Sequence, residues 1–225
     1  MFQDSAADML REKLRADREQ LFRALRSEIR DERVLRAMAR VPRELFVPEN
    51  KRHVAYEDRP LPIEAGQTIS QPFIVALMTE ALELTGMEKV LEVGSGSGYQ
   101  AAILGELARE VISVERIPAL ADRAGRILHE LGYTNIKVYV AERTLGWRAE
   151  APYDAIIVTA AAPSVPQELV DQLATNGVMV IPVGLRWEQD LLKIRKKDGL
   201  AVVHLTPCRF VPLMGEGAWE EGSTE

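Results

Sequence analysis

Three glycines alternate with two serines in one short segment of this chain, Gly94-Ser95-Gly96-Ser97-Gly98. The segment follows an apolar run that carries one acidic residue, Glu92, and it precedes a stretch with helical spacing from 99 to 107. A glycine has no Cβ, so it can adopt a positive φ and let a ligand lie against the main chain. A buried strand, a glycine turn and a helix in this order are typical of the first half of a nucleotide-binding β-α-β unit. We therefore predict that this loop binds a nucleotide-containing cofactor.

The spacing of the loop indicates which cofactor it serves. Dinucleotide-binding loops follow G-x-G-x-x-G and phosphate loops end in Gly-Lys-Ser/Thr, whereas this loop reads Glu92-x-Gly94-x-Gly96-x-Gly98. The first turn of the following helix has no lysine or arginine that could meet a phosphate. A ligand with an amino-acid end and a sulfonium fits better than a pyrophosphate. This is the pattern of S-adenosylmethionine (SAM)-dependent methyltransferases, and it disfavours an NAD enzyme.

A second acidic residue, Glu115, ends the next predicted strand, about 17 residues after Gly98. In nucleotide-binding folds an acid near this spacing binds the ribose hydroxyls. The alternative is a solvated strand end that binds no ligand. Because strand, loop and acid agree with one another, we expect Glu115 to bind ribose.

The composition of the 225 residues, 47% hydrophobic and 28% charged, is that of an ordinary globular protein. The net charge of −6 gives no overall attraction to nucleic acid, so we expect no nucleic-acid partner. A single cysteine, Cys208, excludes an intrachain disulfide, and the histidines match no metal-ligand spacing, so we expect no metal. The polar start and the lack of a long apolar run predict a cytoplasmic protein with no membrane partner.

Strand-like and helix-like segments alternate along the chain. This alternation implies a mainly parallel sheet with helices on both faces, and the last two strands are spaced as an antiparallel pair. The predicted fold is therefore α/β: a Rossmann-like, doubly wound sheet with an antiparallel end, in which ligands bind at the carboxyl ends of the strands. The predicted strands are 90–93, 111–115, 136–140, 153–159, 178–182, 191–195 and 201–205, and the predicted helices are 99–107, 119–131 and 166–173.

Helical spacing also covers residues 8–40, where Asp31 is placed to cap a second helix that Pro42 ends. An irregular segment follows to about Ile69, and long loops of this kind are often functional. Ser70-Gln71-Pro72 then opens a further helix. We expect an N-terminal helical extension (1–50) that packs on the core, a SAM-dependent methyltransferase domain (51–214) and a disordered tail (215–225).

Several motifs, in one continuous order from about residue 29 to about residue 214, resemble the protein-L-isoaspartate O-methyltransferase family. The segment Gly66-Gln67-Thr68-Ile69-Ser70-Gln71-Pro72 is much more specific than the glycine loop, which SAM methyltransferases share in some form. The other matching motifs are Val41-Pro42-Arg43, Leu45-Phe46-Val47-Pro48, Tyr56-Glu57-Asp58, Pro60-Leu61-Pro62, Leu91 to Ala102, Pro152-Tyr153-Asp154 and Pro182-Val183-Gly184.

The resemblance implies a repair enzyme that transfers a methyl group from SAM to the free α-carboxylate of L-isoaspartyl residues and leaves S-adenosyl-L-homocysteine. The ester then collapses to a succinimide, which reopens partly to normal aspartate. The expected partners are isoaspartyl-containing proteins and peptides, and we expect a monomer. A carboxylate is already ionised at pH 7, so the reaction needs no strong base, and positioning can supply most of the catalysis.

By the same resemblance Ser70 orients the acceptor carboxylate, although it could instead serve only as the N-cap of the helix that follows. Main chain around Thr68, Ile69 and Ser70 and around Val211, Pro212 and Leu213 would hold the substrate peptide. The residues expected to bind the cofactor are Gln71, Glu92, Gly94, Ser95, Gly96, Ser97, Gly98, Glu115, Arg116, Glu142 and Arg143.

The chain departs from the family pattern at Ala141-Glu142-Arg143, where the family reads Gly-Asp-Gly. Glu142 keeps a carboxylate on a longer side chain, and Arg143 replaces a glycine beside the expected adenine site. One interpretation is tolerated drift, and the other is a catalytically weakened relative that binds SAM or senses damaged protein. A SAM methyltransferase acting on a small molecule is a further hypothesis, but it has no reason to carry the motif from Gly66 to Pro72.

Overall fold

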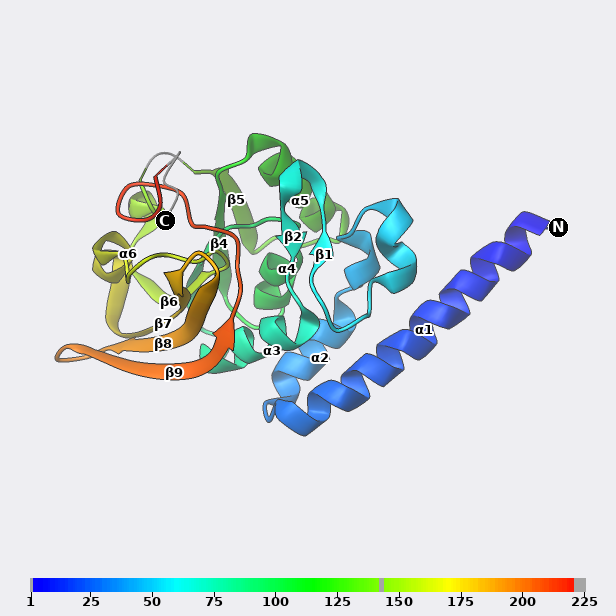
Figure 1. Ribbon diagram of the computed structural model, residues 1–225, viewed down its shortest axis with the longest axis horizontal. Coiled ribbons are helices and arrows are strands. Elements are labelled where there is room, and N and C mark those ends of the chain that lie inside the picture. The colour runs from blue at the N-terminus through cyan, green and yellow to red at the C-terminus, as the bar shows by residue number, and fades with distance from the viewer. Residues whose placement is uncertain (1, 142–143, 221–225) are drawn as a thin grey trace.

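The computed structural model describes residues 2–141 and 144–220. In this part of the chain seven strands form one sheet in the order β5-β4-β3-β6-β7-β8-β9 (Figure 1). The strands β5, β4, β3, β6 and β7 run parallel to one another, whereas β8 is antiparallel to both of its neighbours, β7 and β9. This is the predicted doubly wound fold with an antiparallel end. The strands are β3 (Lys89–Val93), β4 (Glu110–Glu115), β5 (Ile136–Val140), β6 (Tyr153–Val158), β7 (Leu173–Leu185), β8 (Glu188–Lys196) and β9 (Leu200–Cys208).

The strand order reverses at β3, which pairs with β4 on one side and with β6 on the other. In this register Val93 is level with Val114 of β4 and with Val158 of β6. The residues that directly follow these three positions therefore come together at one edge of the sheet, where parallel α/β sheets bind their ligands.

Helices cover both faces of the sheet and explain why its strands read as continuous apolar runs. On one face Val90 packs in a cluster with Leu104 of α4. On the other face Leu91 packs in a cluster with Leu169 of α6. The helices that flank the strands are α3 (Pro72–Ala81), α4 (Tyr99–Gly105), α5 (Pro118–Glu130) and α6 (Gln167–Gln172).

The N-terminal extension consists of α1 (Phe2–Glu28) and α2 (Glu32–Arg40). Asp31 caps α2 as predicted, since its carboxylate accepts a hydrogen bond from the Arg33 amide at 2.8 Å. Leu25 of α1 and Leu35 of α2 are buried in the same core cluster as α3 and α4 residues. The first half of α1 projects away from the rest of the molecule, and its Met9 is 64% exposed (Figure 1).

The segment expected to be irregular contains short elements: η1 (Arg43–Leu45), η2 (Glu49–Val54), β1 (Leu61–Pro62), η3 (Glu64–Gly66) and β2 (Thr68–Ile69). β1 and β2 form an antiparallel ribbon separate from the main sheet. Thr68 and Ile69 of the Gly66 to Pro72 motif form β2, so pairing with β1 fixes the main chain of the motif.

The tail also differs from expectation, because residues 215–220 are folded rather than disordered. The Gly215 amide donates to the carbonyl of Trp219, and the Trp219 amide donates to the carbonyl of Leu213. The guanidinium of Arg186 lies 5.2 Å from the centroid of the Trp219 ring. Main-chain bonds and this cation–π contact hold the segment.

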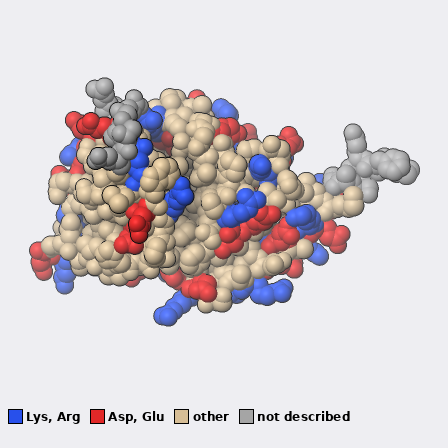
Figure 2. Space-filling model, viewed as in Figure 1, with Lys and Arg blue, Asp and Glu red and all other residues tan. Residues whose placement is uncertain are grey.

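Acidic and basic side chains are interspersed over the face seen in Figure 2. In the described part of the chain no helix is both long and apolar enough to cross a membrane.

Candidate active site

The glycine loop lies directly after β3, and its glycines adopt the backbone conformations that the sequence predicted. Gly94, Gly96 and Gly98 have φ values of 101°, 50° and 86°. A Cβ on Gly94 would lie 2.3 Å from Thr159 Oγ1, and a Cβ on Gly98 would lie 3.1 Å from the Cβ of Ala124. The loop therefore depends on glycine both for its conformation and for its close packing, and it presents main chain to the cleft.

Glu115 ends β4 and organises the loop beside it. Its Oε2 accepts a hydrogen bond from the Gly96 amide at 2.8 Å, and its Oε1 accepts one from the Ile117 amide at 2.9 Å. A carboxylate has about four lone-pair sites, so both oxygens keep capacity for ligand hydroxyls. The position and chemistry of Glu115 suit the predicted ribose site.

Glu92 lies beneath the loop and is fully buried. Its Oε2 accepts a hydrogen bond from Ser113 Oγ, which lies 2.5 Å from Ser95 Oγ of the loop. Its Oε1 has no hydrogen-bond partner among the described residues. Burial raises the pKa of Glu92 to about 8, the Ser113 hydrogen bond opposes that shift, and the Glu115 carboxylate adds to it. Glu92 therefore supports the loop from beneath, through Ser113 and Ser95.

Ser70 lies at the end of β2 and forms one wall of the cleft. Its carbonyl accepts a hydrogen bond from Arg43 Nη2 at 2.7 Å, while Arg43 Nε donates to the Ala55 carbonyl at 2.8 Å. The Arg43 guanidinium is buried, 4.8 Å from the ring centroid of Tyr99, the first residue of α4. Arg43 thus fixes the Ser70 main chain relative to the helix that follows the glycine loop.

The opposite wall is the segment from Val211 to Leu213. The Ala161 amide donates to the Val211 carbonyl and the Leu213 amide donates to the Ala161 carbonyl, each at 2.8 Å. Ala161 comes shortly after β6, so the wall is attached to the carboxyl edge of the sheet. Thr159, at the same edge, donates its hydroxyl to the Gly94 carbonyl at 2.5 Å.

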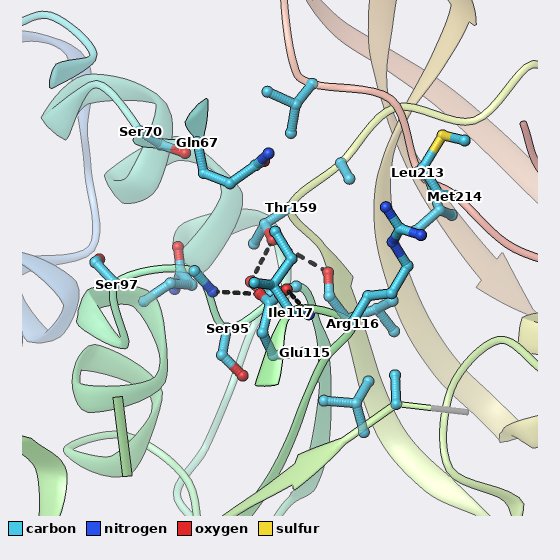
Figure 3. A pocket seen from close by; sticks show the side chains of 18 of the residues that line it. Gln67, Ser70, Ser95, Ser97, Glu115, Arg116, Ile117, Thr159, Leu213 and Met214 are labelled. Carbon is cyan, nitrogen blue, oxygen red and sulfur yellow. Dashed lines mark hydrogen bonds between the residues drawn. The ribbon is translucent and has the colours of Figure 1, made fainter. Parts of the chain in front are cut away.

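These parts enclose one cleft with a volume of about 1040 Å³, open solvent included. Figure 3 shows Ser70 and Gln67 on one side, Leu213 and Met214 on the other, and Glu115, Ile117 and Thr159 in the floor between them. Among the described residues, its only charged lining side chains are Glu115 and Arg116. The described lining residues include no paired general acid and base, which suits an acceptor that is already ionised.

Comparison with known proteins decides the family. A family model described as protein-L-isoaspartate(D-aspartate) O-methyltransferase matches residues 16–218. The chain belongs to this methyltransferase family. It is 54% identical to a protein-L-isoaspartate O-methyltransferase of Methanoculleus marisnigri over 209 residues, which cover 92% of this chain and 95% of that protein. It is 56% identical to protein-L-isoaspartate O-methyltransferase 1 of Syntrophobacter fumaroxidans over 193 residues, 85% of this chain and 90% of that one.

Solved structures of the protein-L-isoaspartate O-methyltransferase family have the same fold. One of them has a TM-score of 0.79 and 30% identity, covering 89% of this chain and 67% of its own. A Plasmodium falciparum structure described as a member of the family has a TM-score of 0.77 and 28% identity, covering 88% of this chain and 98% of its own. The latter was solved in complex with S-adenosyl-L-homocysteine.

The cleft of this family member brings together most of the residues that the sequence pointed to. Those that line it are Thr68, Ile69, Ser70, Gly94, Ser95, Gly96, Ser97, Glu115, Arg116, Val211, Pro212 and Leu213. Glu92 and Gly98 support the loop from behind and are not part of the lining. Glu142 and Arg143 lie outside the described residues.

Two expectations for the helix after Ser70 differ from the structure. Gln71 does not line the cleft, because its side-chain amide donates to Asp58 Oδ2 at 3.1 Å. Ser70 is not the N-cap of α3: that position is Gln71, and the carboxylate of Asp58 accepts from the Phe73 amide at 2.8 Å instead. Freed from capping, the Ser70 hydroxyl is available to a ligand in the cleft.

Gln67, Ile117 and Thr159 are among the lining residues that sequence reasoning did not assign to the site. Thr159 directly follows β6, so the rule that ligands bind at the carboxyl ends of parallel strands would have identified it. Ile117 follows Glu115 by two residues and is found by the same rule. Gln67 lies inside the motif that resembles the family.

Proposed function

We propose that this chain transfers a methyl group from SAM to the free α-carboxylate of L-isoaspartyl residues in damaged proteins and peptides. The observation that carries the proposal is that Gln67 to Ser70, the middle of the Gly66 to Pro72 motif, line a wall facing the glycine-loop floor. Methylation prepares the damaged residue for closure to a succinimide, which restores part of the normal aspartate. S-adenosyl-L-homocysteine remains as the second product.

The residues of the floor fit SAM. Gly94 and Gly96 leave main chain open to the ligand, and Glu115 suits the ribose hydroxyls. When bound, SAM supplies a methyl group on a sulfonium, which a carboxylate oxygen can accept without prior loss of a proton. The chain is therefore required to position the acceptor and to exclude water rather than to remove a proton.

Ser70 is the residue that we assign to the acceptor carboxylate. Its hydroxyl would donate to one carboxylate oxygen and leave the other oxygen to react. The main chain of Thr68 to Ser70 and of Val211 to Leu213 would hold the polypeptide on either side, and main-chain contacts tolerate varied flanking sequences. The methyl ester is neutral, so it loses the charge-assisted part of this hydrogen bond and leaves more readily than the carboxylate.

The proposed activity is tested with two synthetic peptides that differ only in isoaspartyl against aspartyl at one position. Labelled methyl from SAM should enter the isoaspartyl peptide as a base-labile ester and should not enter the aspartyl peptide. Label on neither peptide, with measurable SAM binding, would support the hypothesis of a catalytically weakened SAM-binding relative. Label on small molecules, with no competition by isoaspartyl peptides, would support a small-molecule methyltransferase.

Replacing Ser70 with alanine should lower kcat/KM for the isoaspartyl peptide roughly 10- to 100-fold, because one hydrogen bond to a charged group is lost. The dissociation constant for SAM should stay within about threefold of the parent value, since Ser70 serves the acceptor. Ser27→Ala, near the end of α1, is the matched control. Equal kcat/KM values for Ser70→Ala and the parent would exclude a role for the hydroxyl.

Replacing Glu115 with glutamine should raise the dissociation constant for SAM roughly 10- to 100-fold. A glutamine amide nitrogen cannot accept a hydrogen bond, so either the Gly96 amide or the Ile117 amide loses its partner, and an acceptor for ribose is lost as well. Calorimetric titration with SAM measures the effect, and Asp122→Asn, an exposed acid on α5, is the control. Unaltered SAM affinity in Glu115→Gln would rule out Glu115 as the ribose ligand.

A cytoplasmic location and a monomeric state also belong to this proposal. The single cysteine, Cys208, suits a reducing compartment, and cell fractionation would test the location. Sedimentation at several protein concentrations would test the monomer.

A further inference from the structure

Two large apolar side chains are exposed at the turn that joins β7 to β8. Leu185 is 69% exposed and Trp187 is 74% exposed. Leu185 pairs with Glu188 across this turn, so both apolar residues lie at its tip. β7 runs parallel to β6, and the tip therefore lies at the same edge of the sheet as the cleft. Exposed apolar side chains that gather at one place, rather than singly, mark interaction sites.

The hairpin tip holds both ends of the segment that contains the second wall. At one end, the Arg209 guanidinium lies 4.9 Å from the centroid of the Trp187 ring. At the other end, the Arg186 guanidinium lies 5.2 Å from the centroid of the Trp219 ring. The wall from Val211 to Leu213 lies between these two contacts in the sequence.

Gln189 is buried, only 3% exposed, and its side chain binds both the hairpin tip and the segment that leads into the wall. Its Nε2 donates to the Leu185 carbonyl at 2.8 Å and to the Arg186 carbonyl at 2.9 Å, while its Oε1 accepts from the Phe210 amide at 2.8 Å. One buried side chain thus joins the tip to the segment that leads into the wall. The tip is therefore held in a fixed position relative to the wall.

We propose that Leu185 and Trp187, with Arg209 stacked against the ring, form an outer shelf that binds the substrate polypeptide beyond the isoaspartyl residue. This inference rests on the proposed function, because it takes the wall from Val211 to Leu213 as the peptide-binding wall. The occupant is an extended stretch of the damaged polypeptide that carries an apolar or aromatic side chain. The exposed apolar side chains of the shelf favour an apolar or aromatic side chain in the ligand. Gln189 and the Arg209 contact attach the shelf to the segment that leads into the wall, so we take the ligand to be the polypeptide that lies in the cleft.

The test compares the binding of three peptides, measured by calorimetry in the presence of S-adenosyl-L-homocysteine. The first is an isoaspartyl tripeptide with glycine on both sides. The second places the same centre in a longer chain with leucine and phenylalanine at its outer positions, and the third replaces those two side chains with serine. The parent protein should bind the apolar long peptide about tenfold more tightly than the serine peptide, as burial of one apolar side chain implies.

The variant Leu185→Ser/Trp187→Ser should lose that preference and keep the parent affinity for the tripeptide, because the hydrogen bonds of Ala161 and Gln189 still hold the wall. Val203→Ser is the matched control, since Val203 is 54% exposed on β9 and should leave the preference unchanged. The proposal is overturned if the double variant keeps the preference, if it weakens all three peptides equally, or if the parent shows none. It is also overturned if the double variant shifts a dimer to a monomer in sedimentation, because the shelf would then be a contact between two copies.

Methylation of the tripeptide, assayed alongside, separates this inference from the proposed function. Absence of methyl transfer in the parent would contradict the proposed activity. The dissociation constants of the three peptides would still show whether the shelf binds an apolar side chain.

Discussion

Replacing Gly94 with alanine is expected to weaken SAM binding by at least about 100-fold, equivalent to about 3 kcal/mol. Gly94 has a φ of 101°, which side chains rarely adopt, and its added Cβ would lie 2.3 Å from Thr159 Oγ1. Thr159 cannot move aside without cost, because its hydroxyl donates to the Gly94 carbonyl and its amide donates to the Val93 carbonyl. The loop must therefore shift, and the main chain that faces the cofactor shifts with it.

The matched control for this prediction is Gly125→Ala in α5, where an added Cβ meets nothing within 4 Å. Calorimetric titration with SAM should show parent affinity for Gly125→Ala and a large loss for Gly94→Ala. Combining Gly94→Ala with Thr159→Ala should recover only part of the loss, because it removes the collision and leaves the unfavourable φ. SAM affinity within about threefold of the parent in Gly94→Ala would contradict the role assigned to the loop.

The second large effect concerns the pH dependence of stability, which Glu92 should dominate between about pH 4.5 and pH 8. The pKa of this buried carboxyl is raised from 4.5 to about 8, chiefly by burial. The folded protein therefore keeps a proton that the unfolded chain releases, so the free energy of unfolding is greatest below the lower value and falls as pH rises to the higher one. Replacing Glu92 with glutamine removes the titrating group and should flatten this fall by several kcal/mol.

Urea unfolding of the parent and of Glu92→Gln across pH 5 to pH 9 measures this effect. Glu110→Gln is an informative control, because the Lys137 hydrogen bond lowers the pKa of Glu110. Its contribution is lost only as pH falls through that lowered value, so Glu110→Gln should keep the parent slope in this range. Parallel pH profiles for the parent and Glu92→Gln would show that Glu92 ionises freely in the folded protein.

The parallel part of the fold was predictable from sequence because its signals are local. β3, β4 and β6 agree with their predicted ranges to within one residue, since an unbroken apolar run marks a strand buried on both faces. The bounds of the antiparallel part were harder to predict. β7 extends to Leu173–Leu185, well beyond the apolar core at 178–182, because it also pairs with β6 at Leu173 and with β8 from Val183 to Leu185.

Site residues were predictable where local sequence sets the main-chain conformation. They were less predictable where a residue far away in the sequence sets the position of the side chain. The glycine loop and Glu115 lie where their spacing placed them. The side chain of Gln71 was expected in the cleft, but Asp58 binds it, and that contact spans a separation that no local pattern reveals. Arg43 likewise reads as a surface residue, yet it is buried against Tyr99 and holds the Ser70 carbonyl.

The two walls of the cleft differ from its floor in how they are attached. The floor consists of the ends of central strands, whereas one wall is a ribbon of two-residue strands and the other joins the sheet through the isolated bridge between Ala161 and Pro212. Segments of this kind open locally at a lower free energy than the whole fold. A damaged residue in the middle of a long polypeptide has no free end to thread, so it must enter sideways. The open side of the cleft between the two walls gives it that route.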